Sequence, residues 1–170
     1  MKYLRERKSI FRTEGIIMGL LVYLALLAMF MPLLYIFTSY LNFANYILPT
    51  WTGWAGTAIF TLGILLLWKS HADLGRNWSI TTEIKKEHTL ITNGVFRYIR
   101  HPMYAAYWLW GIAQTLLIQN WIAGLTYLAF FIPLYLLRVP REERMMLEQF
   151  GEDYRLYINR TGRIIPRFRR

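Results

Sequence analysis

The sequence predicts an all-α integral membrane protein with about four transmembrane helices, a folded cytoplasmic loop and a C-terminal cytoplasmic helix. Hydrophobic residues make up 55% of the 170-residue chain and charged residues only 18%, which is too apolar for an ordinary soluble fold. Residues 15–68 contain no Asp, Glu, Lys or Arg in 54 positions, and residues 102–137 contain none in 36. Since a spanning helix needs about 20 apolar residues, each block has room for two spans. A soluble helical bundle would need polar helix faces, which both blocks lack.

The distribution of Lys and Arg predicts the orientation of these spans. Of the 20 basic residues, five precede Gly15, six lie within residues 69–100 and nine within residues 138–170. The two remaining connections, residues 41–50 and 119–120, have none. Under the positive-inside rule, both termini are therefore expected to be cytoplasmic. The net charge of +10 indicates attraction to anionic lipid head groups, not nucleic-acid binding, because the basic residues flank spans and form no soluble patch.

The chain is expected to be a single membrane domain, 1–170, whose residues 1–74 form a helix pair. The first 14 residues are polar and basic, and we expect them to lie along the inner membrane surface. The apolar run that follows is about 25 residues long, longer than the apolar core of a signal peptide, and no clear cleavage site follows it. It is expected to be a retained helix, roughly Gly15–Ser39, with a kink at Pro32 that neighbouring helices can tolerate.

A second helix is predicted over roughly Trp51–Trp68, after a short uncharged outer loop at residues 40–50. Tryptophans at both ends of this helix are typical of membrane–water interfaces. The helix is expected to continue beyond the apolar run and to stop at Gly75, because glycine commonly ends helices. His71 and Asp73 in this extension are expected to be surface residues of the helix end.

Residues 76–100 form a cytoplasmic connection of 25 residues, which is long for a compact chain. The connection is rich in apolar side chains such as Trp78, Leu90 and Phe96, which are too apolar to be left in water. Asn93-Gly94 is a turn signal within it. We therefore expect this loop to fold back onto the helices.

A third helix is predicted to begin at Pro102, because the first helical position leaves an N–H unpaired and proline has none. It should run to about Ile118, followed by an outer turn at Gln119–Asn120 and a fourth helix over roughly Trp121–Arg138. Both helices are near the lower length limit for a membrane span.

Pro140 is expected to open a separate cytoplasmic helix, Arg141–Phe150, after the fourth span. Two glutamates fall in its first turn, where the helix dipole favours acidic side chains. Gly151 is expected to cap this helix, and residues 152–170 are expected to form a tail with a turn at 160–163.

Several polar side chains gather at the cytoplasmic ends of the third and fourth helices. A two-residue turn joins these helices, so they must be antiparallel neighbours, with His101 and Arg138 at the same membrane depth. Ionisable groups at membrane depth indicate a functional site. The set comprises His88, Arg100, His101, Tyr104, Arg138, Glu142 and Glu143.

The chemistry of this set suits one zwitterionic ligand and one acidic, lipid-borne ligand. Backbone N–H groups at the helix start at Pro102 can bind a carboxylate. Glu142 and Glu143 can pair with an amino or cationic group, and Arg138 can hold a second carboxylate at the lipid boundary. The chain has no GxGxxG, Walker A, GxSxG or HExxH motif. It also has no cysteine and only three scattered histidines, so no metal site is predicted.

Two segments carry a family resemblance: HTLITNGVFRYIRHPMY at residues 88–104 and RVPREERMMLEQFGEDYRLYINRTGRIIP at residues 138–166. Together they resemble the isoprenylcysteine carboxyl methyltransferase family of integral membrane enzymes, over roughly residues 75–166. The resemblance implies methyl transfer that depends on S-adenosylmethionine, onto the carboxylate of a prenylated acceptor in the membrane. Residues 75–170 would then be the cofactor-binding core. Family members often carry more helices before this core than the two predicted here.

The resemblance also implies roles for individual residues. Arg138 would face the acceptor carboxylate, and either Glu142 or Glu143 would contact the cofactor. Glu83 is a further polar contact to the cofactor, and Phe96 stands where the family commonly has tyrosine. The implied lining of the cofactor pocket is His88, Thr89, Leu90, Ile91, Phe96, His101, Pro102, Met103 and Tyr104.

A carboxylate is already ionised at neutral pH, so methylating it needs positioning and exclusion of water but no general base. The expected partners are a lipidic carboxylate acceptor and membrane lipids, without nucleic acid or an obligate protein partner. One alternative is a phospholipid or small-amine N-methyltransferase, which would need a path for the amine proton. Others are a membrane reductase that binds a nicotinamide cofactor and a non-catalytic scaffold that grips anionic lipid.

Overall fold

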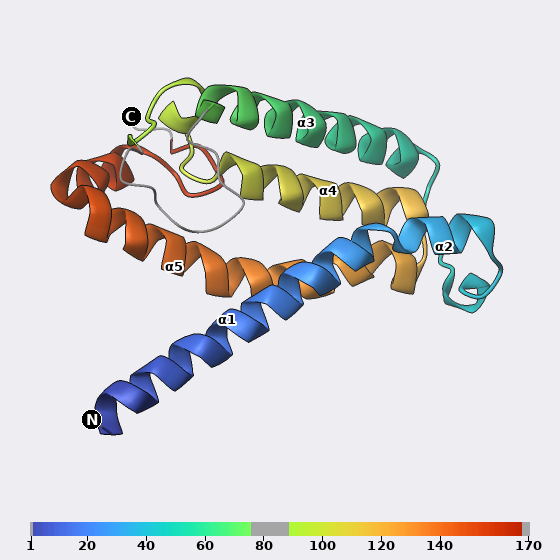
Figure 1. The fold of residues 1–170 in the computed structure, drawn as a ribbon. Coiled ribbons are helices and arrows are strands. Elements are labelled where there is room, and N and C mark those ends of the chain that lie inside the picture. The colour runs from blue at the N-terminus through green and yellow to red at the C-terminus, as the bar shows by residue number, and fades with distance from the viewer. Residues whose placement is uncertain (1, 76–88, 168–170) are drawn as a thin grey trace.

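A computed structural model describes residues 2–75 and 89–167, with side chains from Gly15 onward in these ranges. Its regular elements are all helical, which confirms the predicted fold class (Figure 1). In chain order they are α1 (Lys2–Met29), α2 (Met31–Phe37), η1 (Asn42–Ala44), α3 (Trp51–Leu74), η3 (Gly94–Arg97), α4 (Pro102–Ile118) and α5 (Trp121–Arg160).

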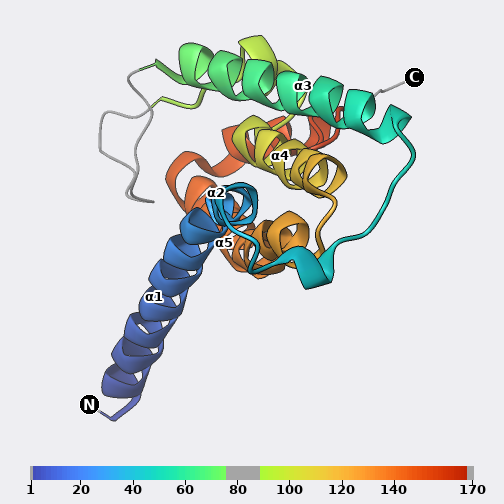
Figure 2. The ribbon, with the colours of Figure 1, turned by 90° about the vertical axis from the view of Figure 1, so that its right-hand side faces the viewer.

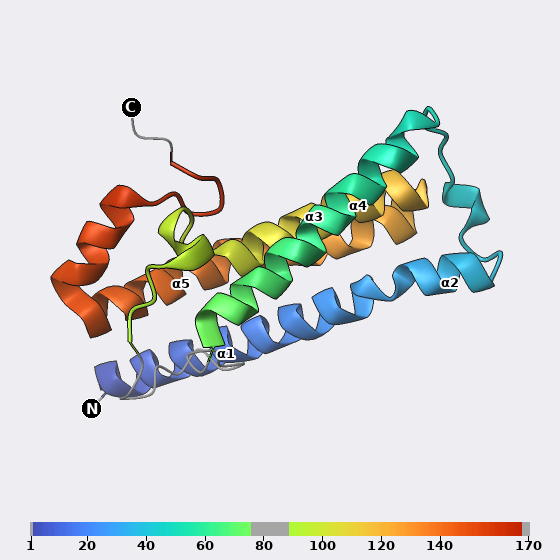
Figure 3. The same ribbon diagram turned by 90° about the horizontal axis from the view of Figure 1, so that it is seen from above.

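The long helices pack in a row in which α4 lies between α3 and α5, and α1 lies against α5 (Figures 1 and 2). Within the described ranges, three helical stretches are long and apolar enough to cross a membrane: Gly15–Phe37, α3 and α5. Helix α4 is charge-free and has 17 residues, at the lower limit for a span. The start of α1, the start of α4 and the tail after α5 lie at the same end of the row (Figures 1 and 3).

The first helix differs from its prediction at one end and agrees at the other. Helix α1 runs without a break from Lys2 to Met29. The expectation that the first 14 residues lie along the membrane surface is therefore wrong, because the segment from Lys2 continues the axis of the span (Figure 3). The kink expected at Pro32 is confirmed, since the helix is interrupted at Phe30 and Pro32 lies in the first turn of α2.

The separate helix predicted to open at Pro140 is wrong. Helix α5 continues through Pro140, and its non-helical residue is Gly151, with φ 52° and ψ −121°, a conformation that glycine adopts readily. Proline removes one helical hydrogen bond, but burial of Val139 and Glu143 on either side of it keeps the helical path. The chain turns at Gly151, so the straight part of α5 before it, 30 residues from Trp121, is about 45 Å long. This exceeds the hydrocarbon thickness of about 30 Å, so the charged C-terminal part of the helix must extend beyond the apolar span.

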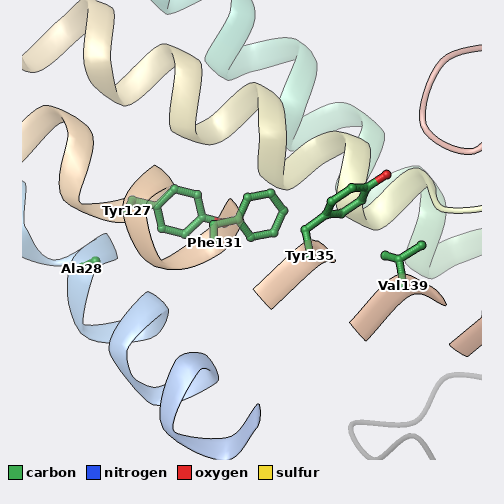
Figure 4. Close-up of a cluster of buried hydrophobic side chains, with 5 residues drawn as sticks. All are labelled: Ala28, Tyr127, Phe131, Tyr135 and Val139. Atoms are coloured by element: carbon green, nitrogen blue, oxygen red, sulfur yellow. The ribbon is translucent and has the colours of Figure 1, made fainter. Parts of the chain in front are cut away.

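The core is aromatic and follows one face of α5. Tyr127, Phe131, Tyr135 and Val139 recur every four residues on this face and are buried, and Ala28 of α1 lies at one end of the cluster (Figure 4). Tyrosine and tryptophan side chains of α4 cover the other side of the cluster. The core therefore joins α1, α4 and α5 and ends beside the charged part of α5.

Asn120 connects the start of α5 to the loop between α2 and α3. Its fully buried side chain accepts the N–H groups of Ile122 and Ala123 at 3.1 and 2.9 Å, which caps α5. Its amide nitrogen donates to the carbonyl of Leu41 at 2.7 Å and to Oδ1 of Asn45 at 2.8 Å. The predicted turn at Gln119–Asn120 is thus present and also anchors the loop that follows α2.

Replacing Asn120 with alanine is expected to lower the free energy of unfolding by about 2 kcal/mol, because the change removes a helix cap and the two hydrogen bonds to Leu41 and Asn45. Thermal unfolding in detergent, followed by circular dichroism, measures the loss. Asn159→Ala is the matched control, because Asn159 is exposed near the other end of the same helix. Equal thermal midpoints for the two variants would contradict the assigned role.

Candidate functional site

The loop before α4 is held against the end of α3 by Asp73. An oxygen of Asp73 accepts the N–H of Val95 at 2.8 Å, and the other accepts Nζ of Lys69 at 2.5 Å. Gly94 has φ 57°, and the Asp73 carboxylate occupies the place where a Cβ would stand, so a larger residue would collide there. Asp73 is only 12% exposed, so its expected place at the surface is wrong. The predicted fold-back of the loop is confirmed for its described part, where Phe96 is buried.

The tail after α5 pairs with the residues that lead into α4. The N–H of Arg100 donates to the carbonyl of Gly162, and that of His101 donates to the carbonyl of Arg163, both at 2.9 Å. The N–H of Gly162 returns a bond to Tyr98 at 3.1 Å. Pro102 has no N–H, so the N–H groups that an anion could bind at the start of α4 are those of the next residues in the first turn.

Glu142 lies at the side of the polar cluster next to the charge-free part of α5. Its Oε1 accepts the hydroxyl of Tyr104 at 2.8 Å and Nε of Arg138 at 2.7 Å. Its Oε2 lies 3.9 Å from Nδ1 of His101. The carboxylate therefore joins α4 to α5 at the point where the charge-free part of α5 ends.

Glu143 faces the tail. Its Oε1 accepts Nε of Arg100 at 3.1 Å and Nε of Arg163 at 3.2 Å, and its Oε2 accepts Nη2 of Arg163 at 2.5 Å. The hydrogen bond that Arg163 donates to Glu143 raises the pKa of Arg163, whereas partial burial lowers it. Nη1 of Arg100 also donates to the carbonyls of Ile158 and Thr161, at 3.2 and 2.5 Å. The two consecutive acids therefore bind different neighbours, Glu142 on the α4 side and Glu143 on the side of the tail.

His101 lies between the two acids, and its side chain is 9% exposed. Its Nε2 is 3.3 Å from Oε1 of Glu143, but the angles do not make a hydrogen bond. Among the described residues, this buried nitrogen therefore has no hydrogen-bond partner. Buried polar atoms are normally paired, so the atom is a candidate contact for a ligand.

Aromatic rings extend from the polar cluster into the apolar region. The ring centroid of Tyr104 lies 5.6 Å from that of His101, 5.8 Å from that of Tyr135 and 6.5 Å from that of Phe131. Trp108 continues the series, 5.4 Å from Phe131. The arrangement places charged side chains directly beside a row of aromatic rings, which suits a ligand with one polar and one apolar part.

The structure brings six of the residues singled out in the sequence into one cluster. These are Arg100, His101, Tyr104, Arg138, Glu142 and Glu143. Other candidates flank this cluster: Pro102 and Met103 begin α4, and Thr89, Leu90, Ile91 and Phe96 lie on the loop before it. Glu83 and His88 lie outside the described residues.

Sequence reasoning missed the contacts that the end of α5 and the tail after it make with the site and its loop. Arg163 binds Glu143, and Tyr157 donates its hydroxyl to the carbonyl of Phe96 at 2.6 Å. The sequence places both residues after a predicted helix end, with no spacing pattern that links them to the loop. The expected tail begins later than predicted, because residues 152–160 are helical and belong to α5. The available sequence signal was compositional, since Tyr154 and Tyr157 are too apolar to be left exposed.

Comparisons with known proteins find similar sequences and a similar fold. The model of the isoprenylcysteine carboxyl methyltransferase family matches residues 55–148. The protein-S-isoprenylcysteine O-methyltransferase of Schizosaccharomyces pombe is 26% identical, over 62% of this chain and 45% of its own length. The human protein of that name is 29% identical, over 69% of this chain and 42% of its own.

A solved structure of the eukaryotic intramembrane Ras methyltransferase ICMT is similar in fold. Its TM-score is 0.57 at 28% identity, over 68% of this chain and 42% of that chain. The chain therefore spans about half the length of the relatives it matches. The range matched by the family model, residues 55–148, includes α4, most of α5 and the charged residues at the end of this hairpin.

Proposed function

The chain belongs to the isoprenylcysteine carboxyl methyltransferase family, and we propose that it transfers a methyl group from S-adenosylmethionine to the carboxylate of an isoprenylcysteine or similar lipidic acceptor. The observation that carries the proposal is the cluster of Glu142, Arg138 and His101 at the charged end of the α4–α5 hairpin. The Lys and Arg distribution places this end, and both termini, on the cytoplasmic side. In this proposal residues 75–170 form the methyltransferase core, and the helices of residues 1–74 complete a single membrane domain.

The residues at the start of α4 fit the chemistry of the cofactor. S-adenosylmethionine has an ammonium, a carboxylate and a sulfonium, and supplies the electrophilic methyl group when bound. Glu142 would hold the ammonium, and the N–H groups of Met103 and Tyr104 would hold the carboxylate. The unpaired Nε2 of His101 offers a further hydrogen bond, and the ring of Tyr104 suits a nearby positive charge. We assign the flanking residues to the same pocket: Glu83, His88, Thr89, Leu90, Ile91, Phe96, Pro102 and, by its contact with His101, Glu143.

Arg138 is suited to the acceptor. It uses Nε to bind Glu142, and among the described residues its Nη1 and Nη2 atoms make no hydrogen bond. These two donors would hold an acceptor carboxylate, with the acceptor's apolar chain in the lipid region beside α5. A carboxylate is ionised at neutral pH, so the side chains need only align it with the methyl group and exclude water.

A methyl-transfer assay tests the proposal. Purified protein in detergent receives methyl-labelled S-adenosylmethionine with either N-acetyl-S-farnesylcysteine or an ethanolamine lipid. We expect label in the farnesylcysteine fraction and its release as methanol in base, because esters hydrolyse and N-methyl groups do not. Base-stable label in the ethanolamine lipid would replace the proposal with an amine methyltransferase. If S-adenosylmethionine fails to bind at millimolar concentration, a non-catalytic scaffold is the better explanation.

A further inference from the structure

The C-terminal tail makes main-chain and side-chain contacts with the site at the same residue. Arg163 accepts the N–H of His101 through its carbonyl at 2.9 Å, while its guanidinium binds both oxygens of Glu143. We propose that Arg163 is a positioning residue that fixes the direction of the His101 ring and thereby the affinity for the cofactor. This inference rests on the proposed function.

The charge arrangement explains why Glu143 needs a second arginine. Its side chain is 10% exposed, and a buried carboxylate is costly unless it is paired and its oxygens are hydrogen-bonded. Arg100 binds Oε1 alone through Nε, because its Nη1 is used by carbonyls at the end of α5. Arg163 supplies the bond to Oε2 and a second bond to Oε1. Without it, the Glu143 carboxylate could rotate about its last torsion.

A rotation of the Glu143 carboxylate would change cofactor binding through its effect on His101. Oε1 of Glu143 lies 3.3 Å from Nε2 of His101, close enough that a turned carboxylate would capture this nitrogen in a hydrogen bond. Arg163 and Arg100 together hold the same oxygen, which keeps Nε2 unpaired. The tail thus keeps Nε2 of His101 outside hydrogen-bond geometry with Glu143, although the two atoms lie within ion-pair distance, and leaves this nitrogen able to bond to a ligand.

The test compares Arg163→Ala and Arg163→Lys with Arg160→Ala. Arg160 is a matched control, because it is exposed and its hydrogen bond goes to Leu156 of its own helix at 3.4 Å. We expect Arg163→Ala to lower S-adenosylmethionine affinity about fivefold in calorimetry, as one charge-assisted bond pair is lost, with the acceptor KM unchanged. Arg163→Lys should recover part of this affinity, and Arg160→Ala should bind as the wild type does.

A second measurement does not depend on the cofactor. Amide hydrogen exchange of the peptide containing His101 should become faster in Arg163→Ala and stay unchanged in Arg160→Ala. Unchanged exchange in Arg163→Ala would overturn the positioning role. Faster exchange with unaltered cofactor affinity would overturn its link to the cofactor. If the wild type binds no S-adenosylmethionine, the proposed function fails and so does this link, while the exchange rates still decide whether Arg163 holds His101.

The pairing with Glu143 is tested by a double-mutant cycle. Arg163→Ala and Glu143→Gln should lower the thermal midpoint by less in combination than the sum of their separate effects, because they remove the same bonds. Arg160→Ala and Glu143→Gln should add. Additive effects for the first pair would overturn the assignment of Arg163 to the Glu143 carboxylate.

Discussion

Arg138→Ala is expected to lower kcat/KM for a farnesylcysteine acceptor about 100-fold, because a bidentate bond to the acceptor carboxylate would be lost. Affinity for S-adenosylmethionine should stay within about twofold, a small free-energy change, since the Tyr104 hydroxyl still holds Glu142 at 2.8 Å. Turnover with labelled cofactor and calorimetry with unlabelled cofactor measure the two effects separately.

Arg144→Ala is the matched control for this change. Arg144 is exposed and lies on the same helix, so its loss removes a similar cationic side chain without touching Glu142. Arg138→Lys should recover only part of the activity, because an ammonium cannot bind a carboxylate through two parallel bonds. An equal loss of cofactor affinity and turnover in Arg138→Ala would move Arg138 from the acceptor to the cofactor.

The helix hairpin could be predicted from the sequence because its signals are local. Pro102 begins α4 and Ile118 ends it, as expected from the charge-free block and from the turn at Gln119–Asn120. The start of α3 at Trp51 and its stop at Gly75, with φ 52°, likewise follow from composition and one glycine. These features need no knowledge of what each helix packs against.

Pro140 shows where local signals mislead. The missing N–H of a proline favours a helix start, and the sequence offers no sign that burial of Val139 outweighs it. The cap expected at Gly151 is confirmed, because the helical path breaks there and the chain reverses direction, so that Arg163 returns to Glu143. Contacts made across such a reversal depend on its angle, which the sequence does not specify.

The sequence also could not assign separate roles to the two acids. Glu142 and Glu143 are adjacent, so in a helix they point about 100° apart, and the sequence does not say which direction faces the pocket. The structure places Glu142 toward Tyr104 and Arg138, and Glu143 toward Arg100 and the tail. The two positions should therefore respond differently to the same substitution.

Glu142→Gln is expected to weaken S-adenosylmethionine binding by about 10- to 100-fold, because an amide cannot form a charge-assisted bond with the cofactor's ammonium. Its thermal midpoint in detergent should fall by less than that of Glu143→Gln, since an amide oxygen can still accept the Tyr104 hydroxyl and Nε of Arg138, and only one arginine loses its counterion. Calorimetry and thermal unfolding of the same preparation measure both quantities.

Glu143→Gln is the matched control, with the same chemistry one residue away and the opposite expected result. It leaves the charges of Arg100 and Arg163 without a counterion, and breaking a buried pair of this kind costs about 3–5 kcal/mol. The loss of unfolding free energy should be about 3 kcal/mol or less, because Arg163 is 46% exposed and water screens its charge. Glu143→Gln should therefore lower the thermal midpoint, while its effect on cofactor affinity is smaller than that of Glu142→Gln and acts through His101. The reverse pattern, with stability lost at Glu142 and affinity lost mainly at Glu143, would exchange the roles of the two acids and place the cofactor on the side of the tail.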